Sequence, residues 1–280
     1  MKQRIITAVI LAPLVVAGIF LLPLPSFIIA LAIIALIGFW EWTQFVEQPS
    51  RLLKLIPGVA VGALSFYLLP FDSINLDTVV DSHFAMLCLG AVWWVVASIL
   101  AITYPRSADL WRSSSILRHA FGILTILPFF WSVVLLRAEN MTTDVYHGAK
   151  LVLFVCILVW VADSGAYFAG KSFGKHKMAP RVSPNKTIEG LIGGVIAALI
   201  AGWFAAKWFD IQFSSYAALF ITTLLTVVIS VLGDLVESMF KRVSGIKDSG
   251  NIIPGHGGVL DRIDSLTAAF PIFTLLYFSF

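Results

Sequence analysis

Long apolar segments recur along nearly the whole 280-residue chain, with short polar loops between them. A helix that crosses a bilayer needs roughly 20 mostly apolar residues. Nine segments approach this length: 5–22, 26–46, 52–69, 84–104, 116–136, 151–170, 188–208, 213–232 and 265–280. The pattern predicts an all-α polytopic integral membrane protein with about nine transmembrane helices.

Composition excludes the soluble classes of protein. Hydrophobic residues make up 59% of the chain and charged residues 12%, and the mean hydropathy is +0.93. Soluble domains carry about 25% charged residues, so a soluble enzyme, a disordered protein and a nucleic-acid-binding module are all excluded. Cys88 and Cys156 lie inside apolar segments and are predicted to be small core residues rather than a disulfide or a metal site.

The basic residues predict the orientation. With the N-terminus in the cytoplasm, only Arg137, Lys150 and Lys207 of the 19 Lys and Arg residues fall on the outer side. This asymmetry follows the positive-inside rule and predicts an outer C-terminus. The first segment follows Lys2 and Arg4 and has no small-residue cleavage site after it, so we interpret it as a retained span rather than a signal peptide.

Polar residues that carry chemistry gather in the second half of the chain. We expect residues 1–150 to form a scaffold of transmembrane helices, and residues 151–280 to form the functional region, with two cytoplasmic loops. No internal repeat is present in the sequence.

The loop between the eighth and ninth predicted spans, residues 233–265, is the longest polar stretch. Asp234, Glu237 or Ser238, and Lys241 lie three to four residues apart. They share one face if the eighth span continues as a helix beyond the membrane.

The end of this loop has the same character. Asp261 and Asp264 share a face if the ninth helix begins there, and Gly-His-Gly-Gly precedes them at 255–258. Carboxylates hold Mg²⁺, Lys and Arg bind phosphate oxygens, and glycines let backbone N–H groups approach an anion. We interpret the loop as a phosphate site. An ordinary juxtamembrane loop would explain its bases but not its acids.

The loop between the sixth and seventh spans also mixes acids and bases. Asp163 lies near the end of an apolar span, where it is either a solvated helix-end residue or part of a site. Asn185 or Thr187 is predicted to cap the next helix, with Glu189 in its first turn. A helix N-terminus on this side is also an anion site, and the two interpretations are compatible.

Glu41 and the isolated histidines have ordinary structural interpretations. Glu41 lies between Trp40 and Trp42 near the inner end of its span, which is typical of an aromatic belt with an acid that reaches the headgroups. The histidines at 83, 119, 147 and 176 are isolated and are predicted to be incidental. His256 differs because glycines surround it.

Three stretches together resemble a known family. They are Ser-Met-Phe-Lys-Arg at 238–242, Lys-Asp-Ser-Gly at 247–250 and Ile-Pro-Gly-His-Gly-Gly-Val-Leu-Asp-Arg-Ile-Asp at 253–264. They resemble the signature of phosphatidate cytidylyltransferases, also called CDP-diacylglycerol synthases. Asp-Ser-Gly-Ala-Tyr at 163–167 and Ser-Pro-Asn-Lys-Thr-Ile-Glu-Gly at 183–190 are similar to other segments of that family. The motifs cover about residues 160–265, and residues 1–150 match only as a hydrophobic multi-span half.

The resemblance implies an enzyme of the bacterial inner membrane with its active site facing the cytoplasm. It would transfer the cytidylyl group of CTP to phosphatidate, giving CDP-diacylglycerol and pyrophosphate for phospholipid biosynthesis. Mg²⁺ is implied as the cofactor and a homodimer as the assembly, with lipid and dimer contacts in the scaffold 1–150 and the catalytic region at 151–280. No nucleic acid is expected as a partner. The implied metal ligands are Asp234 and Asp261, with Asp264 a weaker candidate.

The candidate site residues fall into two sets. The catalytic set is Asp234, Lys241, Arg242, Lys247, Asp248, His256, Asp261 and Arg262. The substrate-binding set is Asp163, Ser164, Tyr167, Ser183, Asn185, Lys186, Thr187, Glu189, Ser238, Gly257 and Gly258.

Three other functions remain open from the sequence. A CDP-archaeol synthase would use an ether lipid in a similar site, and a CTP-dependent polyprenol kinase is a related membrane enzyme. A transporter is a different class of protein. It would place charged or broken helices at the middle of the membrane, whereas the polar residues here collect at one face.

Overall fold

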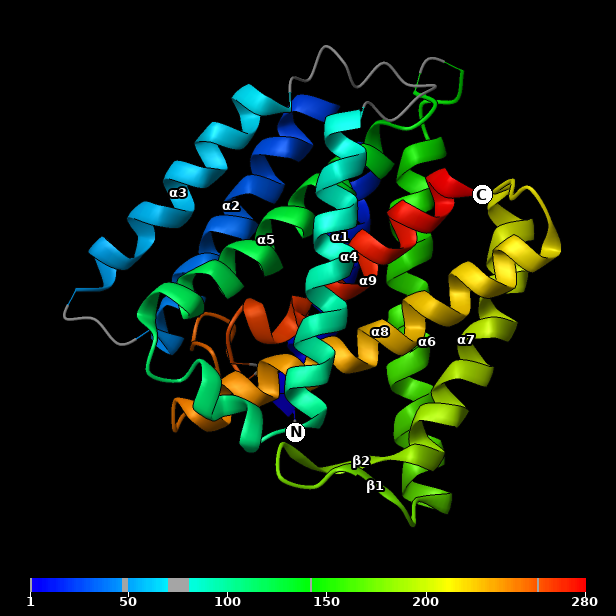
Figure 1. Ribbon diagram of the computed structural model, residues 1–280. Helices are drawn as coiled ribbons and strands as arrows, with labels where there is room; N and C mark the ends of the chain where they lie inside the picture. Colours follow the sequence, from blue (N-terminus) through cyan, green and yellow to red (C-terminus); the bar gives the residue numbers. More distant parts are fainter. Residues whose placement is uncertain (1, 47–49, 70–80, 142, 256) are drawn as a thin grey trace.

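The chain is a bundle of helices. The computed structural model describes residues 2–46, 50–69, 81–141, 143–255 and 257–280 (Figure 1). Nine α-helices lie in these ranges: α1 (Lys2–Leu21), α2 (Leu24–Trp42), α3 (Arg51–Leu68), α4 (Asp81–Ile102), α5 (Ser115–Ala138), α6 (His147–Phe173), α7 (Ile188–Phe209), α8 (Tyr216–Val243) and α9 (Leu260–Ser279).

Seven helices, α2 to α8, are long and apolar enough to cross a membrane. The chain is therefore an all-α integral membrane protein. The apolar part of α1, Val9–Leu21, is shorter than a full span. Each predicted apolar segment overlaps one helix, and the two helix extensions on which the site depends are confirmed. Helix α8 continues to Val243, and α9 begins at Leu260.

Short non-α elements lie between the long helices. They are the 3₁₀ helices η1 (Thr43–Phe45) and η3 (Arg106–Leu110), and the strands β1 (Lys177–Ala179) and β2 (Ser183–Thr187). The strands form an antiparallel hairpin that pairs Lys177 with Thr187 and Ala179 with Ser183. The apolar pattern of the sequence does not predict this hairpin. Pro184 has no N–H and disfavours a helix there, whereas an edge strand accepts it.

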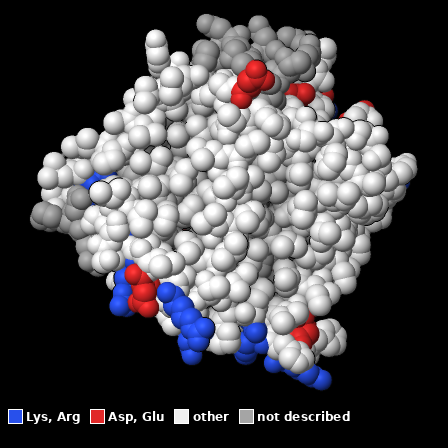
Figure 2. All heavy atoms as spheres, viewed as in Figure 1, with Lys and Arg blue, Asp and Glu red and all other residues white. Residues whose placement is uncertain are grey.

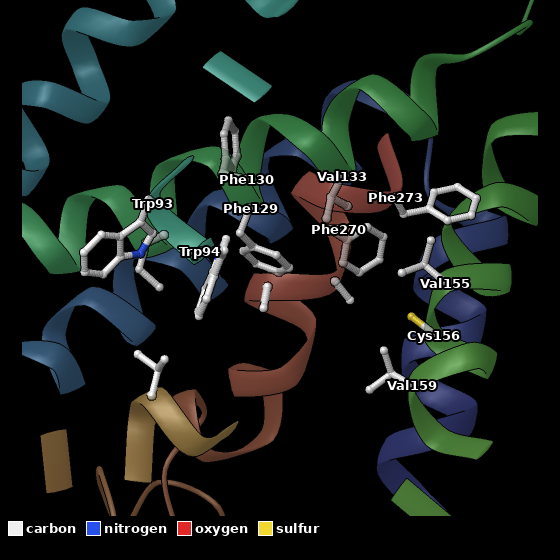
Figure 3. Packing of buried hydrophobic residues seen from close by; sticks show 14 of the residues in the cluster. Trp93, Trp94, Phe129, Phe130, Val133, Val155, Cys156, Val159, Phe270 and Phe273 are labelled. Atoms are coloured by element: carbon white, nitrogen blue, oxygen red, sulfur yellow. The ribbon is translucent and has the colours of Figure 1, made fainter. Parts of the chain in front are cut away.

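The core lies where α4, α5, α6 and α9 meet. Figure 3 shows Trp94 of α4 next to Phe129 of α5, with Phe270 of α9 on the other side of Phe129. A Cβ added at Gly90 of α4 would lie 2.6 Å from the Cβ of Pro128 on α5 and 3.2 Å from that of Pro271 on α9. Close packing against two proline-containing turns therefore requires a glycine at this position. Cys156 is buried in this core, and neither Cys156 nor Cys88 forms a disulfide, as predicted.

Helices α6 and α7 pack through small residues. A Cβ at Gly194 of α7 would lie 2.6 Å from the carbonyl oxygen of Ala162 on α6. A Cβ at Gly165 of α6 would lie 2.8 Å from the Cβ of Ala197 on α7. Such residues let helix backbones approach closely in a membrane protein. The contact fixes the end of α6 beside the hairpin that leads into α7.

The two ends of the bundle differ in charge. Figure 1 places the N-terminus, the hairpin and the α8–α9 connection toward one end, and the C-terminus and the α5–α6 connection toward the other. Figure 2 shows Lys and Arg side chains along the hairpin end and a broad uncharged surface next to them. The charged connections and the apolar belt are thus separated in space as they are in the sequence.

Candidate active site

A lysine joins the two helices that carry the signature. Lys241 Nζ of α8 lies 2.8 Å from Asp261 Oδ1 of α9, and 3.6 Å from Glu237 Oε2 one turn earlier on α8. All three side chains are largely buried. The shared helix face predicted for α8 therefore points at the first turn of α9.

Asp261 also binds the backbone of the preceding loop. Its Oδ2 accepts hydrogen bonds from the N–H groups of Ser249 (2.9 Å) and Gly258 (2.8 Å). Burial would raise the pKa of this carboxyl, but the hydrogen bonds from Lys241, Gly258 and Ser249 hold the pKa below its usual value. Asp261 is therefore an anion throughout the physiological pH range.

The turn before Asp261 requires glycine. Gly257 has φ +85°, which side-chain-bearing residues rarely adopt, and a Cβ there would lie 2.6 Å from Asp261 Oδ2. The glycine lets the turn close over the carboxylate and donate the Gly258 N–H to it.

Two further carboxylates lie beside this pair. Neither oxygen of Glu237 has a hydrogen-bond partner among the described residues, although the side chain is buried. Asp264 of α9 is the second of these carboxylates, and it lies close to Glu237. Helices α8 and α9 are in close contact here, since a Cβ at Gly233 would lie 2.7 Å from the Cβ of Ala268 and 3.1 Å from the carbonyl oxygen of Asp264.

A second acid–base pair connects the hairpin to α8. Lys186 Nζ of β2 lies 2.6 Å from Asp234 Oδ2 and 3.1 Å from the carbonyl oxygen of Val231. Asp234 Oδ1 accepts a hydrogen bond from Ser238 Oγ at 3.2 Å. The carboxylate of Asp163 on α6 interacts electrostatically with Lys186, Asp234 and Arg262. Residues from both predicted loops therefore meet at one site.

Other candidates from the first loop organise the chain around this site. Thr187 is the N-cap of α7 and accepts a hydrogen bond from the Gly190 N–H at 3.1 Å, as predicted. Glu189, in the first turn, accepts hydrogen bonds from the N–H groups of Lys175 and His176 and pairs with His176 Nδ1 at 2.6 Å.

Several candidates take no part in the buried ion pairs. Arg242 is exposed, and its Nε donates to the carbonyl oxygen of Val182 at 3.1 Å, so it holds the hairpin instead of joining Lys241. Ser164 Oγ donates to the Trp160 carbonyl of its own helix. Tyr167, Asn185, Lys247, Asp248 and Arg262 are exposed, Ser183 is half-buried, and His256 lies outside the described residues.

The interpretation of Glu41 was wrong. Its side chain is 1% exposed and points into the protein, where it accepts hydrogen bonds from the N–H groups of Val259 (3.0 Å) and Leu260 (2.7 Å). Trp42 next to it is also buried. Sequence reasoning missed this residue because its partners lie more than 200 positions away, and an acid between two tryptophans at a span end looks interfacial.

The oxygen donors suit a hard cation. Among the described residues, no group of three or more His, Cys, Asp or Glu side chains is placed to hold a metal by itself. Mg²⁺ is usually held by one or two carboxylates together with substrate phosphates. The buried carboxylate of Glu237 accepts no hydrogen bond among the described residues, and it lies 3.6 Å from Lys241 Nζ, which also pairs with Asp261. This arrangement fits that mode of binding, and it does not fit a cage made of protein alone.

Comparison with known proteins decides the family. A family model described as the cytidylyltransferase family matches residues 2–280. The chain belongs to the cytidylyltransferase family. The match spans both halves of the protein, including residues 1–150, where the motifs did not reach.

Relatives within the family match over almost their whole length. The phosphatidate cytidylyltransferase of Haemophilus influenzae is 45% identical, with 99% of each chain covered. That of Pseudomonas aeruginosa is 41% identical, covering 99% of this chain and 96% of the relative. That of Bacillus subtilis is 33% identical, covering 99% and 97%.

Proposed function

We propose that the protein transfers the cytidylyl group of CTP to phosphatidate and forms CDP-diacylglycerol and pyrophosphate. Full-length relatives of this family carry the name of that reaction. The observation that carries the proposal is the cluster of paired acids and lysines on β2, α8 and α9, at one end of an apolar bundle. A lipid headgroup and a nucleotide can meet at such a place while the acyl chains stay in the bilayer.

The proposed reaction needs the repulsion between two phosphate groups to be reduced more than it needs a general base. The phosphate of phosphatidate is already an anionic nucleophile, and its difficulty is to approach a triphosphate of the same sign. Lys241 and Lys186 supply positive charge at fixed positions, because each is held by a carboxylate. Positioning of this kind lowers the barrier by holding the reacting groups in line.

Mg²⁺ is the proposed cofactor, held by Asp234 and Asp261 with Asp264 as a weaker candidate. When bound, it would supply positive charge to phosphate oxygens. Asp261 is kept anionic by its N–H donors, and the Gly257–Gly258 turn fixes its direction. Arg262 and Lys247 are exposed, and we propose that they bind pyrophosphate oxygens.

The membrane arrangement is part of the proposal. All nine helices cross the bilayer, the N-terminus and the site face the cytoplasm of a bacterial inner membrane, and the C-terminus lies outside. The separation of charge in Figure 2 supports this orientation. Residues 1–150 serve as the scaffold and residues 151–280 as the catalytic region, and the enzyme acts as a homodimer.

Transfer of a specific phosphorus atom tests the function. Purified protein is given phosphatidate, Mg²⁺ and CTP labelled at either the α- or the γ-phosphate. Cytidylyl transfer places the α-label in the lipid and the γ-label in pyrophosphate. A polyprenol kinase would instead place the γ-label in a lipid, and a transporter would release no pyrophosphate. The rates with an ester phosphatidate and with its ether analogue distinguish the proposed enzyme from a CDP-archaeol synthase, which would use the ether lipid.

A further inference from the structure

The first turn of α9 has no cap of its own. Its N-cap residue, Val259, has no side-chain acceptor, so the first N–H groups of the helix need partners from elsewhere. Asp261 accepts the Gly258 N–H, and Glu41 accepts those of Val259 and Leu260. Two carboxylates from distant parts of the chain thus share three consecutive N–H groups.

Glu41 and Asp261 also share Ser249. The Ser249 N–H donates to Asp261, and its Oγ donates to Glu41 Oε2 at 3.3 Å. Gln44 Nε2, one turn after Glu41, donates to the carbonyl oxygen of Ser249. The end of α2 and the following η1 therefore hold both sides of the α8–α9 loop, at Ser249 and at the start of α9.

Two signature glycines are explained by the same carboxylate. A Cβ at Gly250 would overlap Glu41, which supplies all three of its nearest atoms. A Cβ at Gly258 would lie 2.5 Å from Glu41 Oε2. Neither glycine has the positive φ that would require it on backbone grounds. Room for Glu41 is the physical reason for glycine at 250, and room for Glu41 together with Ser249 Oγ, which the added Cβ would overlap, is the reason at 258.

We propose that Glu41 is a positioning residue of the transfer site. Its carboxylate holds the α8–α9 loop so that Asp261 faces Lys241. The effect on turnover rests on the proposed function, whereas the effect on the loop does not. The scaffold half of the chain thereby supplies a part of the site that the signature itself lacks.

Hydrogen exchange tests the loop directly. In Glu41→Gln, the side chain keeps one acceptor oxygen and presents an N–H₂ in place of the other. At least one of the amides of Val259 and Leu260 therefore loses its acceptor and should exchange about tenfold faster. Peptides from the first turns of α7 should exchange as in the wild type, because that helix has its own cap, Thr187. Unchanged exchange at 258–261 would overturn the proposal, and so would equal acceleration in all peptides.

A double-mutant cycle tests the reason for the glycine. Gly250→Ala alone should lower turnover about tenfold, because the new methyl group displaces Glu41. In the Glu41→Ala background, the same change should cost less than about twofold, since the obstacle is gone. Equal losses in both backgrounds would contradict the proposal. Asp109→Asn, a change in an exposed pair with Arg112, is the control that should keep wild-type turnover.

The exchange and turnover measurements together distinguish a failure of the positioning role of Glu41 from a failure of the proposed function. If the wild type makes no CDP-diacylglycerol, the proposed function fails, while exchange at 258–261 still decides whether Glu41 holds the loop. If the wild type is active and exchange in Glu41→Gln is unchanged, only the positioning role fails.

Discussion

Two lysines hold the carboxylates of the site, and they differ in burial. The side chain of Lys241 is 14% exposed and that of Asp261 5%, against 23% and 32% for Lys186 and Asp234. Removing one partner of a buried pair leaves an uncompensated charge, which costs more than breaking a pair that water can reach.

This difference predicts unequal effects on stability. Lys241→Met should lower the free energy of unfolding by about 3 kcal/mol. Lys186→Met should lower it by about 1 kcal/mol or less. Both variants should lose most turnover, because each removes a positive charge from the site. Thermal unfolding in detergent measures the first effect, and equal shifts for the two variants would show that burial does not distinguish the pairs.

At the scale of elements, the crossing of α8 and α9 sets the distances in the site. Gly233 lies at this crossing, directly before Asp234, and has no room for a side chain. Gly62 of α3 has no atom within 4 Å of an added Cβ and offers a matched control.

Gly233→Ala should therefore push the two helices apart. We expect a loss of about 1–3 kcal/mol in the free energy of unfolding, with a fall in turnover. Gly62→Ala should be neutral or stabilise by up to about 1 kcal/mol, because alanine is the better helix former. Unfolding and turnover assays on the two variants check this, and a harmless Gly233→Ala would argue against a close crossing.

The long apolar segments predicted the helices well, because an apolar segment of that length has few stable structures in a membrane other than a spanning helix. The sequence also predicted that Asp234, Glu237 and Lys241 share a face, since local spacing sets that relation. It could not separate Arg242 from Lys241, because the partner of Arg242 is a carbonyl on a hairpin that was not foreseen. Nor could it find Glu41, whose role depends on the tertiary contact of α2 with α9.

At the scale of the whole molecule, the orientation in the membrane can be tested with single cysteines. The chain already contains Cys88 and Cys156, which must first be replaced. Ser249 is fully buried and is unsuitable as a probe. A cysteine at Ser73 would probe the loop expected outside, between the third and fourth predicted spans, but Ser73 lies outside the described residues. Two exposed positions lie at opposite ends of α6 and suit this purpose. Ser172 is in the last turn of the helix, and Val145, which is 59% exposed, comes just before its first residue.

Ser172→Cys should react with an impermeant maleimide only after the inner membrane is opened. Val145→Cys should react in intact spheroplasts, because the α5–α6 connection is proposed to lie outside. Labelling of the protein on gels gives the readout. The reverse pattern would place the site on the outer face and refute the cytoplasmic orientation.

The most direct test of the proposed active site is the turnover of Asp261→Asn. This change keeps the shape of the side chain but removes the charge that Lys241, Ser249 and Gly258 hold in place. With CTP, phosphatidate and saturating Mg²⁺ in vesicles, CDP-diacylglycerol formation should fall by a factor of about 10² or more, while Asp109→Asn stays at the wild-type rate. Near-normal turnover of a correctly inserted Asp261→Asn would contradict the assignment of this cluster as the site of transfer.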